Sequence, residues 1–539
     1  MNIIVSQFSF SFSRVIIEDL IDELKPNRIY NFSAYNGRIT KKFQGTEILN
    51  FKYSDNYFGE YSDADFNCLL PLDESVISNF YFLESQVLEM MDRDFEYIIQ
   101  DNSSDYSTYI QAKLSEQEDL SSIKQGKKLS QIPYRKRKEI YYRHLRYWYD
   151  FFSKNTVDYF ISFYIPHTSQ SFIAWNVAKY FGAKEIIGMK SFIPGNFVFV
   201  NDVNNSCSEI IGEYEKIKTS NQELIFDNDV FKDEIQRVLT NSKPWYMDKN
   251  QVLNLLESSE FSYELKENYM RGKLKSNNNL KFTFSYWKYF SLVLKFFITP
   301  FFRSKIYFSH IFLLDEFKSR VKNKFKLNSL NQIKLFINQI TVDKIEDEDF
   351  IYFPLHMQPE ATTMPLGGLY ANQLLAIEML SNTIPQNWKI YIKEHPAQIV
   401  DFRGIDFYKK ISELPNVKII ASNISTFELI EKCIAVSTIT GVAGWEGVVL
   451  GKNCLLFGNS LFDKCPGVLK INTFDDCKKS IQIVESGLHK PKLENVKWYL
   501  KALENVSVDA ADIPHTFELR GFKVKDHKER VLKAILNKL

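Results

Sequence analysis

The stretch "CIAVSTITGVAGWEGVVLGKNCLLFG", residues 433–458, decides the fold. An apolar strand ends at Ser437 and Thr438, a turn of small residues follows, and a helix is predicted from near Gly441. The second apolar stretch, "NCLLFG", has the length of another strand. A strand, a helix and a strand in this order predict a β-α-β unit, and such units build parallel sheets.

The predicted start of this helix is suited to bind an anion. Unpaired backbone amides and the positive end of the helix dipole lie at such a start, and the hydroxyls of Ser437, Thr438 and Thr440 can add hydrogen bonds to phosphate oxygens. Gly441 lets a ligand or a neighbouring strand come close. Neither the GxGxxG fingerprint nor a GK[ST] phosphate loop is present here. We therefore predict a phosphate at this turn, with simple capping of the helix by the hydroxyls as the alternative.

The stretch "WKIYIKEHPAQ", residues 388–398, supplies a second strand end. Its alternating apolar residues predict a buried strand that stops before Pro396, with Lys393 and His395 at its carboxyl end. In open α/β sheets, ligands bind at the carboxyl ends of the strands. A cation-capable side chain at this position would lie beside the predicted phosphate site.

A third strand end, "YFPLHMQPEATTMP" at residues 352–365, leads into an irregular loop, because its prolines exclude a regular helix. The loop carries polar groups that are candidate ligand contacts: His356, Gln358, Glu360, Thr362 and Thr363. Either histidine, His356 or His395, would by itself more often be structural. Three polar strand ends on one sheet instead predict one shared ligand site, in which Glu446 on the helix would accept hydrogen bonds from a ribose diol.

The same alternation of strands and helices occurs in the amino-terminal half, is absent between about 240 and 340, and resumes after Asp349. At 539 residues the chain is too long for one hydrophobic core. We predict an α/β fold with four regions: a domain with a parallel sheet at 1–235, a helical, basic and aromatic insertion at 236–345, a second domain with a doubly wound parallel sheet at 346–490, and a helical tail at 491–539 that packs back on the domains.

Composition limits the classes of function. A net charge of +1 gives no general attraction to nucleic acid, so no nucleic-acid partner is expected. The six cysteines are scattered without a CxxC pair, which argues against a disulfide framework and a structural zinc site and fits a reducing cytoplasm. Neither a signal peptide nor a run of about 20 apolar residues is present. We therefore expect a cytoplasmic protein that is soluble or peripheral to the inner face of the membrane.

Residues 281–326 combine many aromatic side chains with lysines and arginines, and no acidic residue precedes Asp315 in this stretch. Such a mixture is typical of an interfacial helix on an anionic membrane. Lys295 and Pro300 interrupt the apolar run, which argues against a membrane span. The alternative is a helical linker that packs across both domains and keeps its lysines in water.

Several of these motifs occur together in a known group of enzymes. "KEHP" at 393–396 and "STITGVAGWEGVVLGK" at 437–452 resemble the HP and Ser/Thr motifs of GT-B glycosyltransferases that use CMP-activated acidic sugars, including bacterial sialyltransferases and the capsule-polysaccharide Kdo transferases. "YFPLHMQPEATTMPLGGLYANQLLAIEML" at 352–380 is similar to the start of the carboxyl-terminal domain in capsule or surface-polysaccharide biosynthesis proteins. The resemblance covers residues 350–475 by motif and the amino-terminal half only by architecture.

The resemblance implies a GT-B-like fold, in which two Rossmann-like domains with parallel sheets face a cleft. The amino-terminal domain would bind a glycan or glycolipid acceptor, and the carboxyl-terminal domain would bind the nucleotide-sugar donor. His395 would then contact the donor phosphate, Ser437 and Thr438 would hold phosphate or cytidine ribose, and Glu446 would face the ribose.

The resemblance also implies that neither a metal nor another cofactor is required. The leaving CMP has a single phosphate, whose charge histidine, hydroxyl groups and helix amides can neutralise. A DxD pattern, which would indicate a metal, occurs as "DAD" at 63–65, so the expectation of metal independence rests on the resemblance.

Glycosyl transfer needs a base for the acceptor hydroxyl when the configuration inverts. For this base the sequence offers candidates in three places, which are His167 after the strand in "VDYFISFYIPH", then Asp63 with Glu60 and Asp65 in "GEYSDADFN", and Glu360 on the donor side. Each of them is by itself more often a surface or structural residue. The carboxylate of an acidic sugar would be bound by a cationic neighbour such as Lys393 or Arg403.

These observations predict a glycosyltransferase that moves an acidic ulosonic or nonulosonic sugar, of the Kdo, sialic, pseudaminic or legionaminic type, from a CMP-activated donor to a surface glycan or its lipid-linked precursor. Two alternatives keep the fold and change the donor, namely a CDP-glycerol-type phosphotransferase and a UDP-sugar glycosyltransferase. A third alternative is a non-catalytic nucleotide- or sugar-binding partner in polysaccharide assembly.

Overall fold

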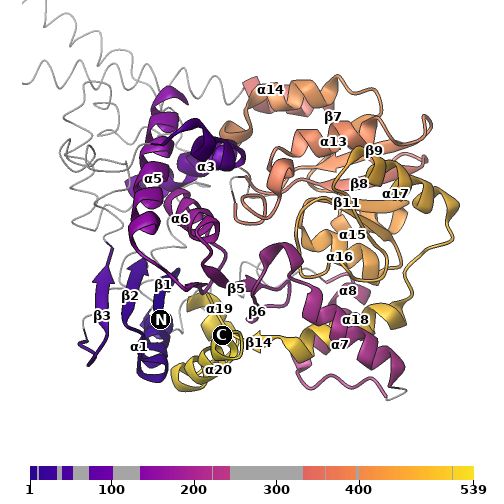
Figure 1. Ribbon diagram of the computed structural model, residues 1–539. Helices are drawn as coiled ribbons and strands as arrows, with labels where there is room; N and C mark the ends of the chain where they lie inside the picture. The colour runs from indigo at the N-terminus through magenta and orange to yellow at the C-terminus, as the bar shows by residue number, and fades with distance from the viewer. Residues whose placement is uncertain are drawn as a thin grey trace, which may run out of the picture.

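Two α/β domains, each built on a seven-stranded sheet, make up the described part of the chain in the computed structural model (Figure 1). The structure describes residues 1–8, 11–32, 39, 41–51, 72–100, 134–220, 223–242, 332–358, 360–395, 398, 400–512 and 514–539. The predicted α/β class with two Rossmann-like domains is confirmed. The basic and aromatic segment at 281–326 lies outside the described residues, as does most of the predicted insertion at 236–345.

The sheet of the amino-terminal half has the strand order β14-β6-β5-β4-β1-β2-β3. Neighbouring strands are parallel from β3 to β5, whereas β6 is antiparallel to β5 and β14 is antiparallel to β6. The strands are β1 (Asn2–Ser6), β2 (Arg28–Phe32), β3 (Glu47–Asn50), β4 (Tyr159–Ser162), β5 (Lys184–Lys190), β6 (Asn196–Val200) and β14 (Val508–Asp509).

The sheet of the carboxyl-terminal half has the order β13-β12-β11-β8-β9-β10-β7, and all of its pairs are parallel. Its strands are β7 (Thr341–Val342), β8 (Phe350–Pro354), β9 (Lys389–Lys393), β10 (Val417–Ile420), β11 (Ala435–Thr438), β12 (Asn453–Leu456) and β13 (Val468–Lys470). The strand order reverses between the neighbours β8 and β11, since β9 and β10 follow on one side and β12 and β13 on the other. This reversal is a topological switch point, where open α/β sheets bind ligands.

Helices cover both faces of each sheet, because the central strands are apolar on both sides. In β1, Ile3 and Val5 pack in the same cluster as residues of α1 and α20, while Ile4 lies on the opposite face with α3, α5 and α6. In the second sheet, Ile390 faces α13, α14 and α17, whereas Tyr391 faces α15.

The helices have the following bounds. In the amino-terminal half they are α1 (Ser11–Leu24), α3 (Glu74–Gln100), α5 (Tyr134–Lys154), α6 (Ser169–Tyr180), α7 (Ser208–Thr219) and α8 (Asp229–Leu239). In the carboxyl-terminal half they are α13 (Gln373–Ser381), α14 (Val400–Ser412), α15 (Thr426–Lys432), α16 (Val442–Val449), α17 (Phe474–Ser486), α18 (Leu493–Val506), α19 (Pro514–Leu519) and α20 (Val524–Leu536).

The chain crosses between the two halves twice. Helices α7 and α8 follow the strands of the first sheet in sequence but lie beside α18, and α8 also packs against α16 (Figure 1). After α18 the chain returns, because β14 joins β6 of the first sheet and α20 packs against α1. The predicted ranges 1–235 and 491–539 therefore each contribute to both halves of the molecule.

Candidate functional site

The switch point brings the loop after β8 onto the turn after β11. The backbone amide of Thr440 donates a hydrogen bond to Nε2 of His356 over 3.1 Å, and Oγ1 of Thr438 lies 3.5 Å from the same nitrogen. The amide of Gly441 in turn donates to Oγ1 of Thr438 over 3.0 Å. Four of the residues selected from the sequence are thus in one place, from two strands that are neighbours only in the folded sheet.

His356 is only 8% exposed, and its hydrogen bonds define its protonation. Because Nε2 accepts the amide proton of Thr440, the ring proton of the neutral imidazole sits on Nδ1. Burial, together with the electrostatic effects of His395 and Arg403, lowers the pKa of His356 to about 3. His356 is therefore a neutral hydrogen-bond donor at physiological pH.

Gly441 is required by this close approach. A Cβ atom at this position would lie 2.9 Å from Nε2 of His356 and 2.9 Å from Oγ1 of Thr438. Gly441 is also the N-cap of α16, and no side chain caps the helix through it. Any larger residue would push the start of α16 away from the histidine.

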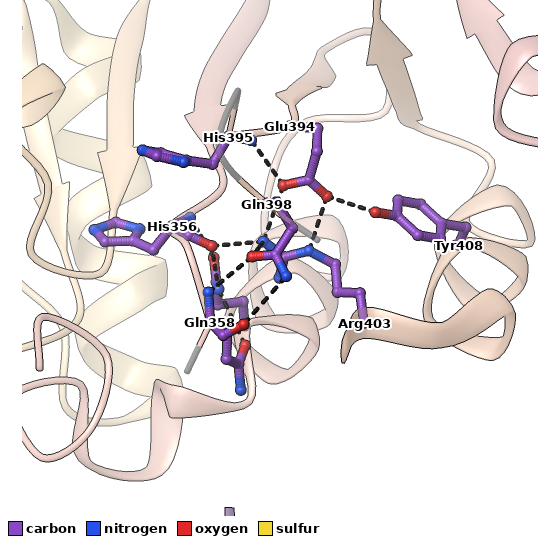
Figure 2. A network of polar contacts seen from close by, with 8 residues as sticks. His356, Gln358, Glu394, His395, Gln398, Arg403 and Tyr408 are labelled. Carbon is purple, nitrogen blue, oxygen red and sulfur yellow. Dashed lines mark hydrogen bonds and ion pairs between the residues drawn. The ribbon is translucent and has the colours of Figure 1, made fainter. Parts of the chain in front are cut away.

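The end of β9 lies next to the end of β8, and it carries His395. Burial lowers the pKa of His395; the carboxylate of Glu394 opposes this effect, the guanidinium of Arg403 adds to it, and Glu360 opposes it. Figure 2 shows the rings of His356 and His395 on the same side of a polar network, away from Tyr408. The two imidazoles therefore border one region at the carboxyl edge of the sheet.

That polar network is centred on Arg403, whose side chain is 3% exposed. Its guanidinium holds Glu394 in a bidentate ion pair, with Nε–Oε2 at 2.8 Å and Nη2–Oε1 at 3.0 Å, and it donates to the carbonyl of His356 over 2.5 Å (Figure 2). Tyr408 donates to Glu394 over 2.6 Å. One buried arginine thus joins the segment after β9 to the segment after β8 and fixes both histidines relative to each other.

Amide side chains complete this connection. The backbone amide of Gln358 donates to Oε1 of Gln398 over 2.8 Å, and Nε2 of Gln398 returns a bond to the carbonyl of Gln358 over 3.1 Å. Gln373 on α13 accepts from the amide of His356 over 2.8 Å. The loop from His356 to Gln358 is therefore held at both its backbone and its side chains.

Three polar atoms near this edge are buried and have no hydrogen-bond partner within the described part of the chain. They are Nδ1 of His356, Oε2 of Glu360 and Nη1 of Arg403. Buried polar groups in native proteins are nearly always paired. Two donors and one acceptor left without a protein partner are typical of a place where a polar ligand binds.

Three other residues selected from the sequence lie elsewhere, namely Ser437, Lys393 and, in the next paragraph, Glu446. Ser437 faces the opposite side of β11 from Val436, and its hydroxyl donates to the carbonyl of Leu455 over 3.4 Å. The ammonium of Lys393 donates to the carbonyl of Ile424 over 2.5 Å, at the entrance to α15. Both side chains are bound within the carboxyl-terminal domain rather than to the histidine pair.

Glu446 is 4% exposed and faces α8. Its carboxylate pairs with Arg237 at 2.9 Å, and Arg237 also pairs with Glu234 at 2.7 Å. Burial raises the pKa of Glu446 to about 7, against the effect of Arg237. In this structure, the carboxylate that the sequence places at a ribose connects the two halves of the chain instead.

The candidates for the base are in different situations. His167 follows β4 in the first sheet, and its Nδ1 donates to the carbonyl of Ile165 over 2.8 Å. Glu360 lies in the loop after β8, close enough for its charge to act on His395. Asp63, like Glu60 and Asp65, lies outside the described residues.

The sequence did not reveal the residues that hold the candidate ligand contacts in position. Gln373, Gln398 and Tyr408 were not selected, and Arg403 was assigned to a sugar carboxylate although it pairs with Glu394. The position of Glu394 and Gln398 on either side of the HP dipeptide was the available signal. Nothing in the sequence pointed to Gln373, which reaches His356 from a helix 17 residues away.

Over the residues that the structure describes, no group of three or more His, Cys, Asp or Glu side chains is arranged to hold a metal ion. No described helix combines the length and the apolar character that crossing a membrane requires. The metal independence of the reaction stays a prediction.

The site and the two sheets define a class, namely two-domain α/β proteins with a polar site at the switch point of the carboxyl-terminal sheet. Residues 363–491 match the family model described as capsule polysaccharide biosynthesis protein. That match includes His395 and the whole turn from Thr438 to Gly441, and it begins after His356. No curated protein matches the chain.

Solved structures with some likeness include two from Thermosulfurimonas dismutans. The KpsC beta Kdo 2,7 transferase shares 15% identity over 39% of this chain and 60% of its own, which is under two thirds of its length, with a TM-score of 0.22. The KpsC beta Kdo 2,4 transferase shares 10% identity over 64% and 79%, with a TM-score of 0.28. The UDP-GlcNAc 2-epimerase of Methanocaldococcus jannaschii shares 9% over 92% and 97%, with a TM-score of 0.24. TM-scores this low carry no argument about the fold, which is defined by the strand orders of the two sheets.

Proposed function

We propose that this protein is a glycosyltransferase of capsule or surface-polysaccharide assembly, which transfers an acidic ulosonic or nonulosonic sugar from a CMP-activated donor to a glycan or a lipid-linked precursor. The observation that carries the proposal is the meeting of His356 with Thr438 to Gly441 at the switch point, with His395 beside them. The family match over residues 363–491 supports the link to capsule polysaccharides.

Each group has a role in this proposal. The Nδ1–H of His356 and the ring of His395 would donate to the donor phosphate, and the start of α16 would add its dipole. Hydrogen bonds and a helix dipole directed at one phosphate in this way would stabilise the leaving CMP without a metal. Ser437, Lys393 and Glu446 have no direct role, because their polar groups are bound within the protein.

Nucleotide binding is the first test. CMP and CTP should raise the melting temperature of the wild-type protein, because a ligand that binds only the native state stabilises it by mass action. UMP and UDP should have little effect. Stabilisation by UDP alone would instead indicate a UDP-sugar transferase and would contradict the proposal.

Replacement of one histidine tests the site. His395→Ala should remove the CMP-induced shift and leave the melting temperature of the free protein nearly unchanged. His489→Ala is the matched control, because His489 is an exposed histidine of the same domain. An unchanged CMP affinity in His395→Ala would contradict the assignment of the nucleotide site.

Turnover separates the remaining alternatives. The wild-type protein is mixed with a panel of CMP-activated Kdo, sialic, pseudaminic and legionaminic acids and with CDP-glycerol, and CMP release is measured in the presence of acceptor glycans. Release from a CMP-sugar is the expected result. Release from CDP-glycerol alone would identify a phosphotransferase, and CMP binding without any release would identify a non-catalytic partner.

Attachment to the cytoplasmic face of a membrane through residues 281–326 also belongs to the proposal. Vesicles with anionic lipid should bind the full chain at low salt and release it at high salt, since exposed charges are screened. Replacing Lys318, Arg320, Lys322 and Lys324 together should weaken this binding. Binding that ignores both salt and these replacements would contradict the attachment.

A further inference from the structure

Helix α3 of the amino-terminal half reaches the switch point of the other half through one carboxylate. The apolar side of α3 packs with α5 and α6, and it buries Leu83, Val87 and Met90. Glu89 is half-buried beside this side. In Figure 1, α3 lies on the flank of its domain that is turned towards β8 and α13.

The contact that carries the inference joins Glu89 to Gln358. Nε2 of Gln358 donates a hydrogen bond to Oε2 of Glu89 over 3.0 Å. Gln358 has little freedom, because its backbone is bonded to Gln398 and its Oε1 accepts from Gln373 over 3.2 Å. Gln373 also holds His356. Two hydrogen-bonded glutamines, Gln358 and Gln373, therefore link Glu89 to the backbone of His356.

The surroundings of Glu89 give it the character of a proton acceptor. Burial raises its pKa above the ordinary range of a glutamate, while the hydrogen bond from Gln358 and the positive charge of Arg137 oppose the rise. Arg137 projects from α5 and donates to the carbonyl of Leu88. On α6 the titratable side chains are Lys179, which pairs with Glu185, and Tyr180, which contacts Phe80.

We propose that Glu89 is the catalytic base that takes the proton of the acceptor hydroxyl. This inference rests on the proposed function. In the step, the acceptor oxygen forms a bond to the anomeric carbon of the donor sugar while its proton passes to the carboxylate of Glu89. The bond between the anomeric carbon and the phosphate oxygen breaks, and its electron pair leaves with CMP.

Position favours Glu89 over the candidates selected from the sequence. The base has to approach from the acceptor domain and still reach the donor loops. His167 is held by its own loop in the first sheet, and Glu360 belongs to the donor side. Glu89 is a carboxylate of the amino-terminal half in direct contact with the loop after β8.

The first experiment is Glu89→Gln in the full chain. The glutamine keeps an oxygen that can accept the bond from Gln358 but can no longer take a proton. CMP release should fall by about 10²- to 10⁴-fold, the usual contribution of a general base. The CMP-induced rise in melting temperature should stay as in the wild type. Glu89→Asp keeps the carboxylate and should restore part of the rate, whereas Glu74→Gln, an exposed carboxylate in the first turn of the same helix, should leave the rate unchanged.

The second experiment uses the pH profile, which a merely structural role would not move. Gln358→Leu removes a hydrogen bond that holds the pKa of Glu89 down. The acid limb of the profile of kcat/KM should therefore shift to higher pH. An acid limb at the wild-type position would contradict the assignment.

The two proposals fail in distinguishable ways. If the wild-type protein releases CMP from no CMP-sugar, the proposed function is contradicted, and the role of Glu89 as its base is contradicted as well. If the wild type releases CMP and Glu89→Gln does so at the same rate, only the base is overturned. If Glu89→Gln also loses the CMP-induced shift, the residue supports the fold of the donor site, which likewise overturns the assignment.

Discussion

The two sheets share a strand order around their switch points but differ in the side-chain contacts at those points. In the first sheet the third, second, first, fourth and fifth strands follow one another across the reversal between β1 and β4. In the second sheet β10, β9, β8, β11 and β12 do so across the reversal between β8 and β11, which is the same pattern once the two-residue strand β7 is left out. At the first sheet, Ser162 donates to the carbonyl of Tyr164 over 2.6 Å and His167 to that of Ile165 over 2.8 Å. Both bonds stay within the loop after β4, and the side chain of Gln7, after β1, donates to Oγ of Ser171 on α6 over 3.3 Å.

At the second sheet the segments after different strands are joined by a buried ion pair as well as by neutral bonds. Arg403 binds both Glu394 and the carbonyl of His356, and the amide of Thr440 binds the ring of His356. Burying charges costs free energy unless they are paired, so such a network needs a reason to persist. The comparison teaches that strand order provides two edges of the same kind, and that their side chains give only one of them a buried ion pair.

The largest effect is expected from Arg403→Met. It leaves Glu394 partly buried without its partner and should lower the free energy of unfolding by about 3 kcal/mol. Lys41→Met removes one partner of an exposed pair with Asp22 in the amino-terminal half and should cost less than about 1 kcal/mol. Urea unfolding measures both. Equal losses would break the contrast between the two halves.

A pH dependence of intermediate size is expected from His356. Its pKa is lowered to about 3 in the folded protein, against an ordinary value of 6.5, so only the unfolded chain takes up a proton between these values. Stability is therefore complete above pH 6.5 and falls as the pH falls, by about 2 kcal/mol at pH 5.

Urea unfolding at pH 7.5 and pH 5 tests this, with His356→Gln as the variant that should reduce the loss. Some loss should remain, because burial and Arg530 lower the pKa of His527 to about 4 in the other half and give the same sign. A wild-type-like loss in His356→Gln would show that the imidazole is not held neutral at the switch point.

The smallest effects are expected from removing one hydroxyl group near each switch point. Thr440→Val and Ser162→Ala each remove a hydroxyl that donates to a carbonyl, over 2.7 Å and 2.6 Å, and each should cost about 1 kcal/mol of stability. Only Thr440→Val should weaken the CMP-induced shift in melting temperature. A similar weakening in Ser162→Ala would mean that the two edges are not specialised.

The strands and helices of the carboxyl-terminal half could be predicted because their apolar patterns are strong and their ends are marked. The stretch 433–458 folds into β11, α16 and β12 as its pattern indicates, and α16 begins directly after Gly441. The meeting of His356 with Thr440 follows from the same reasoning, since strand ends of one parallel sheet share an edge.

The side-chain partners could not be predicted in the same way. Ser437 and Thr438 are consecutive in a strand, so their side chains must face opposite sides, but only the packing of the helices decides which one joins the site. Glu446 looks like a ribose ligand in its own motif, and its partner Arg237 lies 209 residues away. The contact between Glu89 and Gln358 spans 269 residues and leaves no local signal.

The return of the chain after α18 has a consequence for biosynthesis. Val508 pairs with Phe197 in the first sheet, and α20 buries Val531 and Ile535 in the same cluster as Ile16 and Ile17 of α1. The ribosome therefore has to make more than 300 further residues after β6 before the last strand and one covering helix of that sheet emerge, which takes roughly 15 to 60 s at about 5–20 residues per second. Until then α1 alone of these two helices covers that apolar face of the nascent sheet, so this half should depend on chaperones during translation more than the half that follows it.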